Sequence, residues 1–305
     1  MKNCSGFCPR APQTLQFDNK MLKIVEKPLA TSTSAVLQSL QALIDAEPDY
    51  GSKVKAAKLG WDTKTSTKAK AEAFRDVRQT LASMCVGPVR CAYCEDSLAD
   101  EVEHIRPKSF FPELVFAWGN YLFACGPCNA PKGSRYGIVV NGSVAEVIRA
   151  PRDPIAPPPP GVAALIDPRT EDPLDFLELD LGGTTPDGID LRSTFDFLPK
   201  DTATAEAQAR AAFSIDVLGL NREVMRVARE NAFSGFRARL REYAGEKERG
   251  ASAERLGEFR DNLLSTPHLT VFAEMRRQKS YLPDVQELFA IAPEAETWPL
   301  FPAGV

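Results

Sequence analysis

The chain has 305 residues, of which 44% are hydrophobic and 26% are charged, the balance of a globular protein that can bury a core. It contains no run of about 18 apolar residues, so no membrane span is expected, and its N-terminus lacks the apolar stretch of a secretory signal. These features predict a cytoplasmic protein with about two domains.

The formal net charge of -4 is unevenly distributed along the chain. Residues 1–160 contain 20 Lys and Arg against 16 Asp and Glu, a net of +4, whereas residues 161–305 contain 17 against 25, a net of -8. The basic half suits a polyanionic partner and the acidic half does not. Eight of the bases lie between Lys53 and Arg78, where they form either a solvated helix face or a phosphate-binding surface.

Hydrophobic spacing predicts two amphipathic helices in the first part of the chain, at about 35–47 and 69–85. Short strand patterns follow at Val102–Ile105 and about Asn120–Ala124. A helix is expected next, with Pro131 in its first turn. The predicted unit is strand, loop, strand and helix.

Asn141-Gly142 predicts a tight type I′ hairpin within residues 137–148. The run Pro157–Pro160 predicts a stiff boundary, followed by a strand that ends near Leu181. From about Thr202 the pattern is helical to about 292. One long helix has its apolar face at Met225, Ala228, Ala232, Phe236, Leu240 and Tyr243.

These patterns predict an α+β fold in which a small module of strands and a helix is embedded in a mostly helical protein. We expect a basic helical region at 1–87, the module at 88–156, and an acidic, mainly helical region at 157–305.

Four of the seven cysteines form two CxxC pairs, Cys91 with Cys94 and Cys125 with Cys128, and 30 residues separate the pairs. Each pair can form a knuckle that directs two thiolates at one point, and two knuckles complete a closed tetrahedral Zn²⁺ site of the structural kind. A redox dithiol explains one pair but not two. The roles of Cys4, Cys8 and Cys85 stay open.

The segment between the knuckles carries a dense motif, CxxC, EHIxPxS, WxN and CxxCNxxKG. It resembles the HNH, or ββα-metal, endonucleases in their four-cysteine zinc form. The resemblance implies that His104 is the general base, and that Glu103 and Asn129 bind a catalytic Mg²⁺ or Mn²⁺. It further implies that Asn120 braces the loop and that Lys132 lies near the scissile phosphate.

The chemistry of the residues agrees with this resemblance. A neutral histidine can take a proton from water near pH 7, and a carboxylate with an amide suits a hard cation while cysteines hold zinc. One departure is that many HNH proteins have Asp where this chain has Glu103. The plainer alternatives are a solvated Lys132, a core position for Trp118 and a structural His268.

A narrower resemblance extends over roughly 90–235. The stretches CAYCE, EHIRPKS, LIDPRTEDPLDFLELD and LGLNREVMRVAREN are similar to HNH proteins found beside ATPases in prokaryotic anti-phage systems, including the Septu and retron types. It implies a nuclease effector whose acidic C-terminal half meets an ATPase partner. DNA is the favoured substrate. A nuclease that cleaves RNA such as tRNA, and a non-catalytic zinc-dependent scaffold, remain alternatives.

Overall fold

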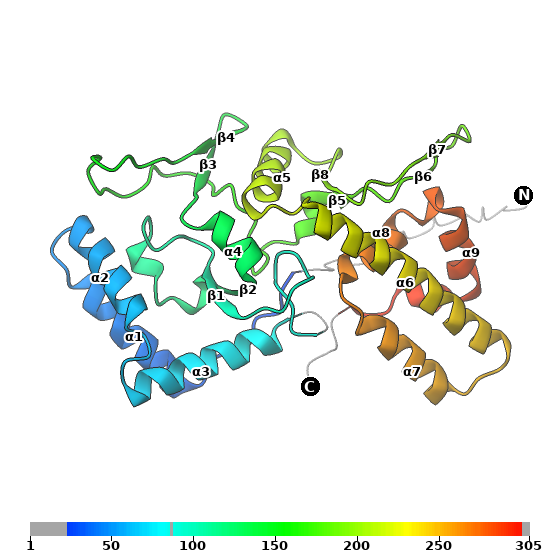
Figure 1. Cartoon of the computed structure of the whole chain (residues 1–305), viewed down its shortest axis with the longest axis horizontal. Helices are drawn as coiled ribbons and strands as arrows, with labels where there is room; N and C mark the ends of the chain where they lie inside the picture. The colour runs from blue at the N-terminus through cyan, green and yellow to red at the C-terminus, as the bar shows by residue number, and fades with distance from the viewer. Residues whose placement is uncertain (1–22, 86–87, 301–305) are drawn as a thin grey trace, which may run out of the picture.

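The computed structural model describes residues 23–85 and 88–300. It is an α+β structure in which the described residues form nine α-helices and small antiparallel sheets of two strands each, as the sequence predicted. Figure 1 shows helices α1 to α3 at one end of the molecule and α6, α7 and α9 at the other. Cys4 and Cys8, whose role the sequence left open, lie outside the described residues.

Three helices form the N-terminal part: α1 (Thr31–Asp45), α2 (Tyr50–Asp62) and α3 (Lys68–Ser83). The first and third correspond to the two amphipathic helices that the spacing predicted. Helix α3 buries its expected face, whereas α1 buries Leu37, Leu40 and Ile44 but leaves Leu43, which was expected on that face, exposed. Helix α2 was not predicted, because Ala57 is its only buried residue and no apolar stripe marks it. The sequence feature that could have identified this helix is its N-cap residue, Asp49, whose side chain accepts the Ser52 N–H.

The predicted strand, loop, strand and helix unit is present in the middle of the chain. Strand β1 (Glu101–His104) pairs antiparallel with β2 (Tyr121–Ala124), so that His104 lies opposite Tyr121. Helix α4 (Gly126–Lys132) follows directly, and β1, β2 and α4 together form a ββα unit.

We expected Pro131 in the first turn of the helix, and this prediction was wrong. The helix begins at the second cysteine knuckle, with Pro127 in its first turn, and Pro131 lies in its last. A proline costs a helix little at the first turn, where its missing N–H has no intrahelical acceptor. The helix ends at Lys132, and Gly133 after it has a positive φ of 47°, which glycine adopts at little cost.

The hairpin of β3 (Gly137–Val140) and β4 (Ser143–Glu146) confirms the type I′ prediction, since Asn141 and Gly142 have φ of 50° and 76°. Such a turn needs positive φ at both central residues, which Asn and Gly tolerate best. Helix α5 (Ala205–Leu218) packs against this hairpin and against α4. It therefore joins the C-terminal region to the ββα unit.

The remaining elements are short strands and helices. Strand β5 pairs with β8, and β6 with β7. The long helix expected on the Met225 to Tyr243 face is α6, and that face is buried except at the half-buried Ala228. The bounds are β5 (Leu177–Leu179), β6 (Gly183–Thr184), β7 (Asp190–Leu191), β8 (Phe197–Pro199), α6 (Glu223–Glu248), α7 (Ala253–Leu264), α8 (Leu269–Arg277) and α9 (Pro283–Ile291).

One continuous hydrophobic cluster runs through the described residues, from Ile24 to Leu300. It contains apolar side chains from all three of the regions that the sequence delimited, together with the four paired cysteines. The ββα unit is therefore packed on both sides, by α3 and by the C-terminal helices. Within the described ranges, no helix combines the length and the apolar character needed to cross a bilayer.

Candidate functional site

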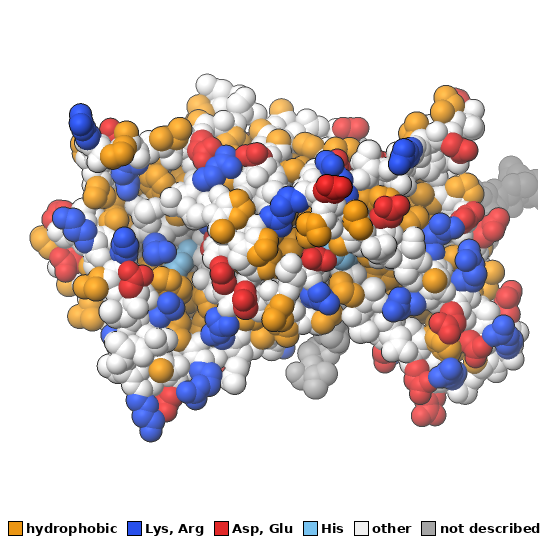
Figure 2. Space-filling model, viewed as in Figure 1, with side chains coloured by type: hydrophobic (Ala, Val, Ile, Leu, Met, Phe, Trp, Pro, Cys, Tyr) orange, Lys and Arg blue, Asp and Glu red, His pale blue; other side chains and the backbone are white. Residues whose placement is uncertain are grey.

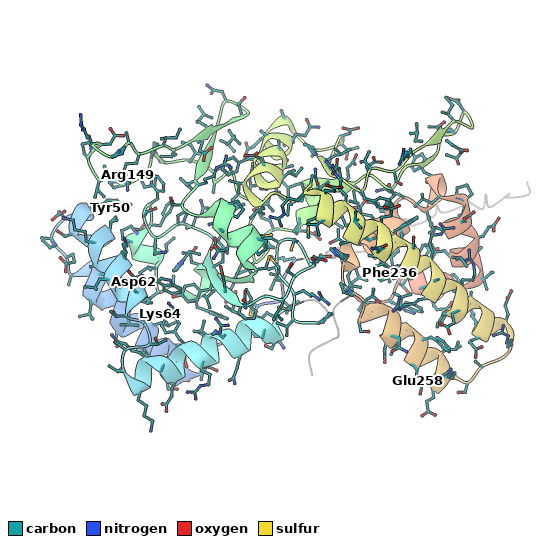
Figure 3. The ribbon with its side chains drawn as sticks, in the orientation of Figure 1. Tyr50, Asp62, Lys64, Arg149, Phe236 and Glu258 are labelled. Carbon is teal, nitrogen blue, oxygen red and sulfur yellow. The ribbon has the colours of Figure 1, made fainter. Side chains whose placement is uncertain are left out.

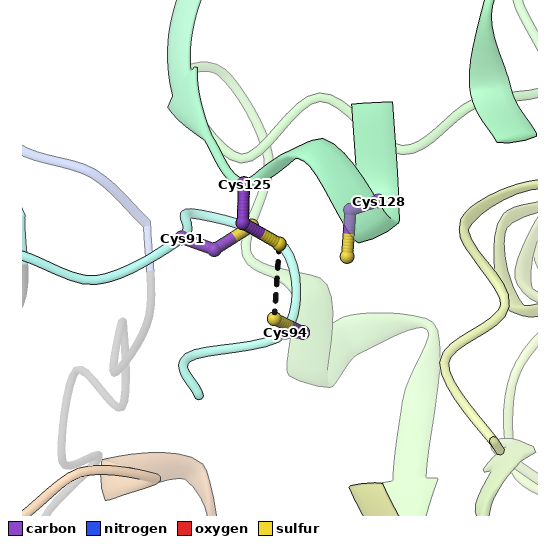
Figure 4. A group of neighbouring side chains, drawn as sticks. All are labelled: Cys91, Cys94, Cys125 and Cys128. Carbon is purple, nitrogen blue, oxygen red and sulfur yellow. Dashed lines mark hydrogen bonds between the residues drawn. The ribbon is translucent and has the colours of Figure 1, made fainter. Parts of the chain in front are cut away.

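The two CxxC pairs come together in space, as the sequence predicted. The Sγ atoms of Cys91, Cys94, Cys125 and Cys128 all lie within 4.8 Å of one another, and all four residues are buried (Figure 4). One pair comes from the loop before β1 and the other from the start of α4. Thiols of the neighbouring cysteines, Cys125 first, hold the pKa of Cys94 well below its usual range by hydrogen bonding.

These four thiols fit a zinc ion. Zn–S bonds of about 2.3 Å in a tetrahedron require sulfur atoms about 3.8 Å apart. The Sγ atoms of Cys94 and Cys125 are separated by 3.8 Å, and the others need only a small contraction. Four soft thiolate ligands in a closed site favour structural zinc over a hard cation.

The side chains of Glu101 and Glu103 leave the same face of β1 and reach α4. The Asn129 amide donates to a Glu101 carboxylate oxygen at 2.6 Å. Two residues along the strand, Glu103 forms an ion pair with Lys132, and both side chains are almost fully buried. Residues two apart share one face of a strand, and residues three apart share one face of a helix. The Glu101–Asn129 and Glu103–Lys132 pairs therefore lie side by side between β1 and α4.

Lys132 is held from a second side, because its ammonium group also donates to the His104 carbonyl at 2.8 Å. Burial raises the pKa of Glu103 while the charge of Lys132 opposes that rise. The structure therefore brings Asn129 next to Glu101, and it engages Glu103 and Lys132 with each other.

His104 is buried, with 5% of its surface exposed, and its ring contacts Trp61 and Tyr121, with the Trp61 ring centroid 4.2 Å away. Its Nε2 lies 3.0 Å from the Val115 carbonyl oxygen, which also accepts the Tyr121 hydroxyl at 2.7 Å. A carbonyl only accepts, so Nε2 carries the hydrogen and Nδ1 carries the lone pair. Burial lowers the pKa of His104 to about 3, so the ring is neutral at pH 7.

Asn120 holds together the two ends of the loop between β1 and β2. Its side-chain oxygen accepts the Arg106 N–H at 2.7 Å. Its amide donates to the carbonyls of Arg106 at 3.1 Å and Leu114 at 3.0 Å. Leu114 precedes Val115, so this brace also positions the carbonyl that His104 contacts.

A cleft of about 510 Å³ opens between α2, α3 and the ββα unit. Cationic side chains from α3 and the loop before it line this cleft, together with carboxylates and an amide from the ββα unit and the residue before it. Figure 2 shows Lys and Arg side chains gathered over the end of the molecule that carries α1 to α3. Lys64 comes just after α2 (Figure 3), and its ammonium lies 4.4 Å from the centroid of the Trp61 ring. The charged, amide and indole side chains that line the cleft are those of Trp61, Lys64, Arg75, Arg78, Asp100, Glu101 and Asn129.

Sequence reasoning gave no role to Trp61, Asp100 or Glu101 of this cleft. Trp61 lies on the helix that was not predicted. Glu101 falls within the strand pattern, and its position two residues before Glu103 was the signal that it shares a face with it. His104 does not itself line the cleft, but its ring contacts Trp61, which does. Away from the cleft, Trp118 packs in the loop and donates to the Lys27 carbonyl. His268 lies 3.2 Å from Asp96 in the first knuckle.

Comparison with known proteins gives one short match. Over 59 residues the chain is 44% identical to the Septu protein PtuB of Bacillus thuringiensis, which covers 18% of this chain and 23% of that protein. The chain thus spans about a quarter of the length of the curated relative it matches. No protein-family model matches the chain, and no solved structure does.

Proposed function

We propose that this protein is a metal-dependent endonuclease of the HNH type, with His104 as general base. The observation that carries the proposal is the buried, neutral imidazole whose Nε2 hydrogen is tied to the Val115 carbonyl. That bond fixes the tautomer and leaves Nδ1 free to take a proton from water.

The low pKa of His104 follows from burial and from the positive charges of Lys108, Lys132 and Lys64. A phosphodiester that enters the cleft brings a negative charge to the same surroundings. That charge favours the protonated imidazole and moves its pKa toward neutrality. Substrate binding thereby strengthens the base at the moment when it is needed.

Asn129 and the carboxylates of β1 are the ligands we propose for a Mg²⁺ or Mn²⁺ ion. Such ions prefer oxygen ligands, and Glu101 and Asn129 offer a carboxylate and an amide oxygen at one side of the cleft. Glu103, the residue that the resemblance implies, becomes a ligand when its pair with Lys132 opens. When bound, the ion neutralises charge on the phosphate and on the leaving oxygen.

Opening that pair also frees the ammonium of Lys132, which the resemblance places near the scissile phosphate. In the described conformation the ammonium reaches Glu103 and the His104 carbonyl instead. The backbone of the substrate is then held mainly by Lys64, Arg75 and Arg78 on the other wall of the cleft. Binding through such contacts weakens steeply with salt, because each neutralised phosphate releases counterions.

We further propose that the nuclease is an effector of an anti-phage defence system. The partial likeness to a Septu protein supports this role. The acidic region 157–305 is poorly suited to a phosphate backbone, and we assign to it the contact with an ATPase partner. DNA is the favoured substrate, and RNA is the second candidate.

The experiment is incubation of the purified full chain with supercoiled plasmid and, separately, with total RNA, in Mg²⁺ or Mn²⁺. His104→Ala is compared with the wild type, and His268→Gln serves as the control, since His268 is the other histidine and lies beside Asp96, whereas His104 contacts the cleft residue Trp61. Loss of a general base typically lowers the rate by about 10²–10⁴.

Plasmid cleavage that is lost in His104→Ala and kept in His268→Gln supports the proposal. Cleavage of RNA alone, with the same dependence on His104, favours the second candidate. Equal cleavage by the wild type and His104→Ala overturns the assignment of the base. If no variant cleaves either nucleic acid with either ion, the non-catalytic scaffold is favoured.

A further inference from the structure

Arg222, the residue that precedes α6, reaches the second cysteine knuckle from the C-terminal region. One guanidinium nitrogen lies 3.6 Å from Cys128 Sγ, and the other donates to the Pro127 carbonyl. Cys128 has no exposed surface. The two residues are 94 positions apart in the sequence, so no local sequence pattern predicts their contact.

The Pro127 carbonyl is available for a specific reason. In an α-helix this oxygen would accept the N–H of the residue four positions later, and that residue is Pro131, which has no N–H. The Pro127 carbonyl, which is at the exposed surface of α4, therefore needs a donor from outside the helix. Arg222 donates to this carbonyl, and the planar guanidinium places its second terminal nitrogen beside the Cys128 thiol.

The charge of a zinc site built from four cysteines explains why a cation is suitable here. Four thiolates and one Zn²⁺ carry a net charge of -2, which is costly to bury without nearby positive charge. Arg222 contacts Cys128 directly. Burial lowers the pKa of the Arg229 guanidinium, two turns further along α6, and the nearby charges of Glu95 and Cys94 oppose that lowering.

The first knuckle is tied to the C-terminal region as well. Glu95 follows Cys94 with a positive φ of 59°, and its carboxylate accepts the Thr270 backbone N–H at 3.1 Å and the Thr270 hydroxyl. Thr270 lies in the first turn of α8, where unpaired N–H groups and the helix dipole favour an anion. Both knuckles are therefore in contact with helices that begin after residue 220.

We propose that Arg222 is a positioning residue of the zinc site, holding the Cys128 thiolate so that zinc binding and docking of the C-terminal helices stabilise each other. Partners outside the first ligand shell typically change metal affinity by about 10- to 100-fold. The proposal concerns the structural metal alone and does not depend on nuclease activity.

The test compares Arg222→Met with Arg226→Met in the full chain. Arg226 is one turn further along and pairs with Asp196 instead of the knuckle, so it is a matched control. Zinc affinity is measured by competition with a chelator, and the site is also loaded with Co²⁺. Removal of an N–H···S donor raises the energy of the sulfur lone pairs, so the sulfur-to-cobalt charge-transfer band should move to longer wavelength.

We expect about a 10- to 100-fold loss of zinc affinity and the band shift in Arg222→Met, and neither in Arg226→Met. Arg222→Lys keeps the positive charge but loses the two-pronged donor geometry of the guanidinium, so we expect it to retain part of the wild-type zinc affinity. If Arg222→Met does not fold, Arg222→Lys is the variant that tests the proposal. Wild-type affinity and an unshifted band in the folded Arg222 variants would overturn the proposal. An equal loss in Arg226→Met would also do so, because it would indicate a general loosening of α6.

Discussion

The buried neutral state of His104 makes the stability of the protein depend on pH in a defined direction. Its pKa is about 3 in the folded chain against an ordinary value of 6.5. Below pH 6.5 the unfolded chain takes up a proton that the folded chain does not. The free energy of unfolding therefore falls as the pH falls from 6.5 toward 3, and this contribution is fully present only above pH 6.5.

The magnitude follows from the same pKa values. Each unit of pH inside the window is worth about 1.4 kcal/mol. Between pH 7 and pH 5 the active part of the window is about 1.5 units, so His104 should contribute a loss of about 2 kcal/mol. Protonation of carboxylates also lowers the free energy of unfolding over this range of pH. Comparison with a variant that lacks the histidine but keeps the carboxylates subtracts their contribution.

His104→Gln is that variant, since its amide can still donate to the Val115 carbonyl and it does not titrate. Urea unfolding of both proteins at pH 7 and pH 5 gives the two losses of free energy, and the wild type should lose about 2 kcal/mol more. Zinc content is measured at each pH, because protonation of thiolates releases the metal. Parallel losses, within about 0.5 kcal/mol of each other, would refute the assignment of a neutral buried imidazole.

Three further predictions concern stability. Metal analysis should find about one zinc per chain, and Cys125→Ser should lose the metal and aggregate, since structural zinc contributes about 10–16 kcal/mol in small modules; soluble folded protein without zinc contradicts this. Asn120→Ala should lower the free energy of unfolding by about 3 kcal/mol, at about 1 kcal/mol for each of its hydrogen bonds; a loss below about 0.5 kcal/mol in urea would argue against the brace. Lys132→Met should cost about 3–5 kcal/mol in thermal unfolding by leaving Glu103 buried and unpaired, and adding Glu103→Gln should recover much of it; no recovery in the double variant would exclude a compensated pair.

Much of the ββα unit could be predicted from the sequence because its signals are local. Each CxxC knuckle is set by four consecutive residues, and the Asn141-Gly142 turn by two. The short strands and the α1 and α3 helices follow from the spacing of apolar residues. Helix α2 escaped this reasoning, since a helix with one buried residue leaves no periodic pattern to detect.

The arrangement of the site depended on contacts that sequence spacing does not specify. The pairing of Glu101 with Asn129 and of Glu103 with Lys132 is set by how β1 meets α4. The sequence named Glu103, Asn129 and Lys132 but not which partner each would take. Rotation of a four-residue strand over a short helix changes these partners without changing the hydrophobic pattern.

The sequence by itself determined which cysteines come together to fit zinc, and where the strands of the ββα unit, the Asn141-Gly142 hairpin and the helices α1, α3 and α6 lie. The tertiary structure alone decided that Trp61 covers His104, that Val115 fixes its tautomer, and that Arg222 reaches Cys128. The physical reason is the range of the interactions. Caps, turns and knuckles are made by neighbours in the chain, whereas burial and the contacts of an imidazole or a guanidinium depend on segments that only the packed core brings together.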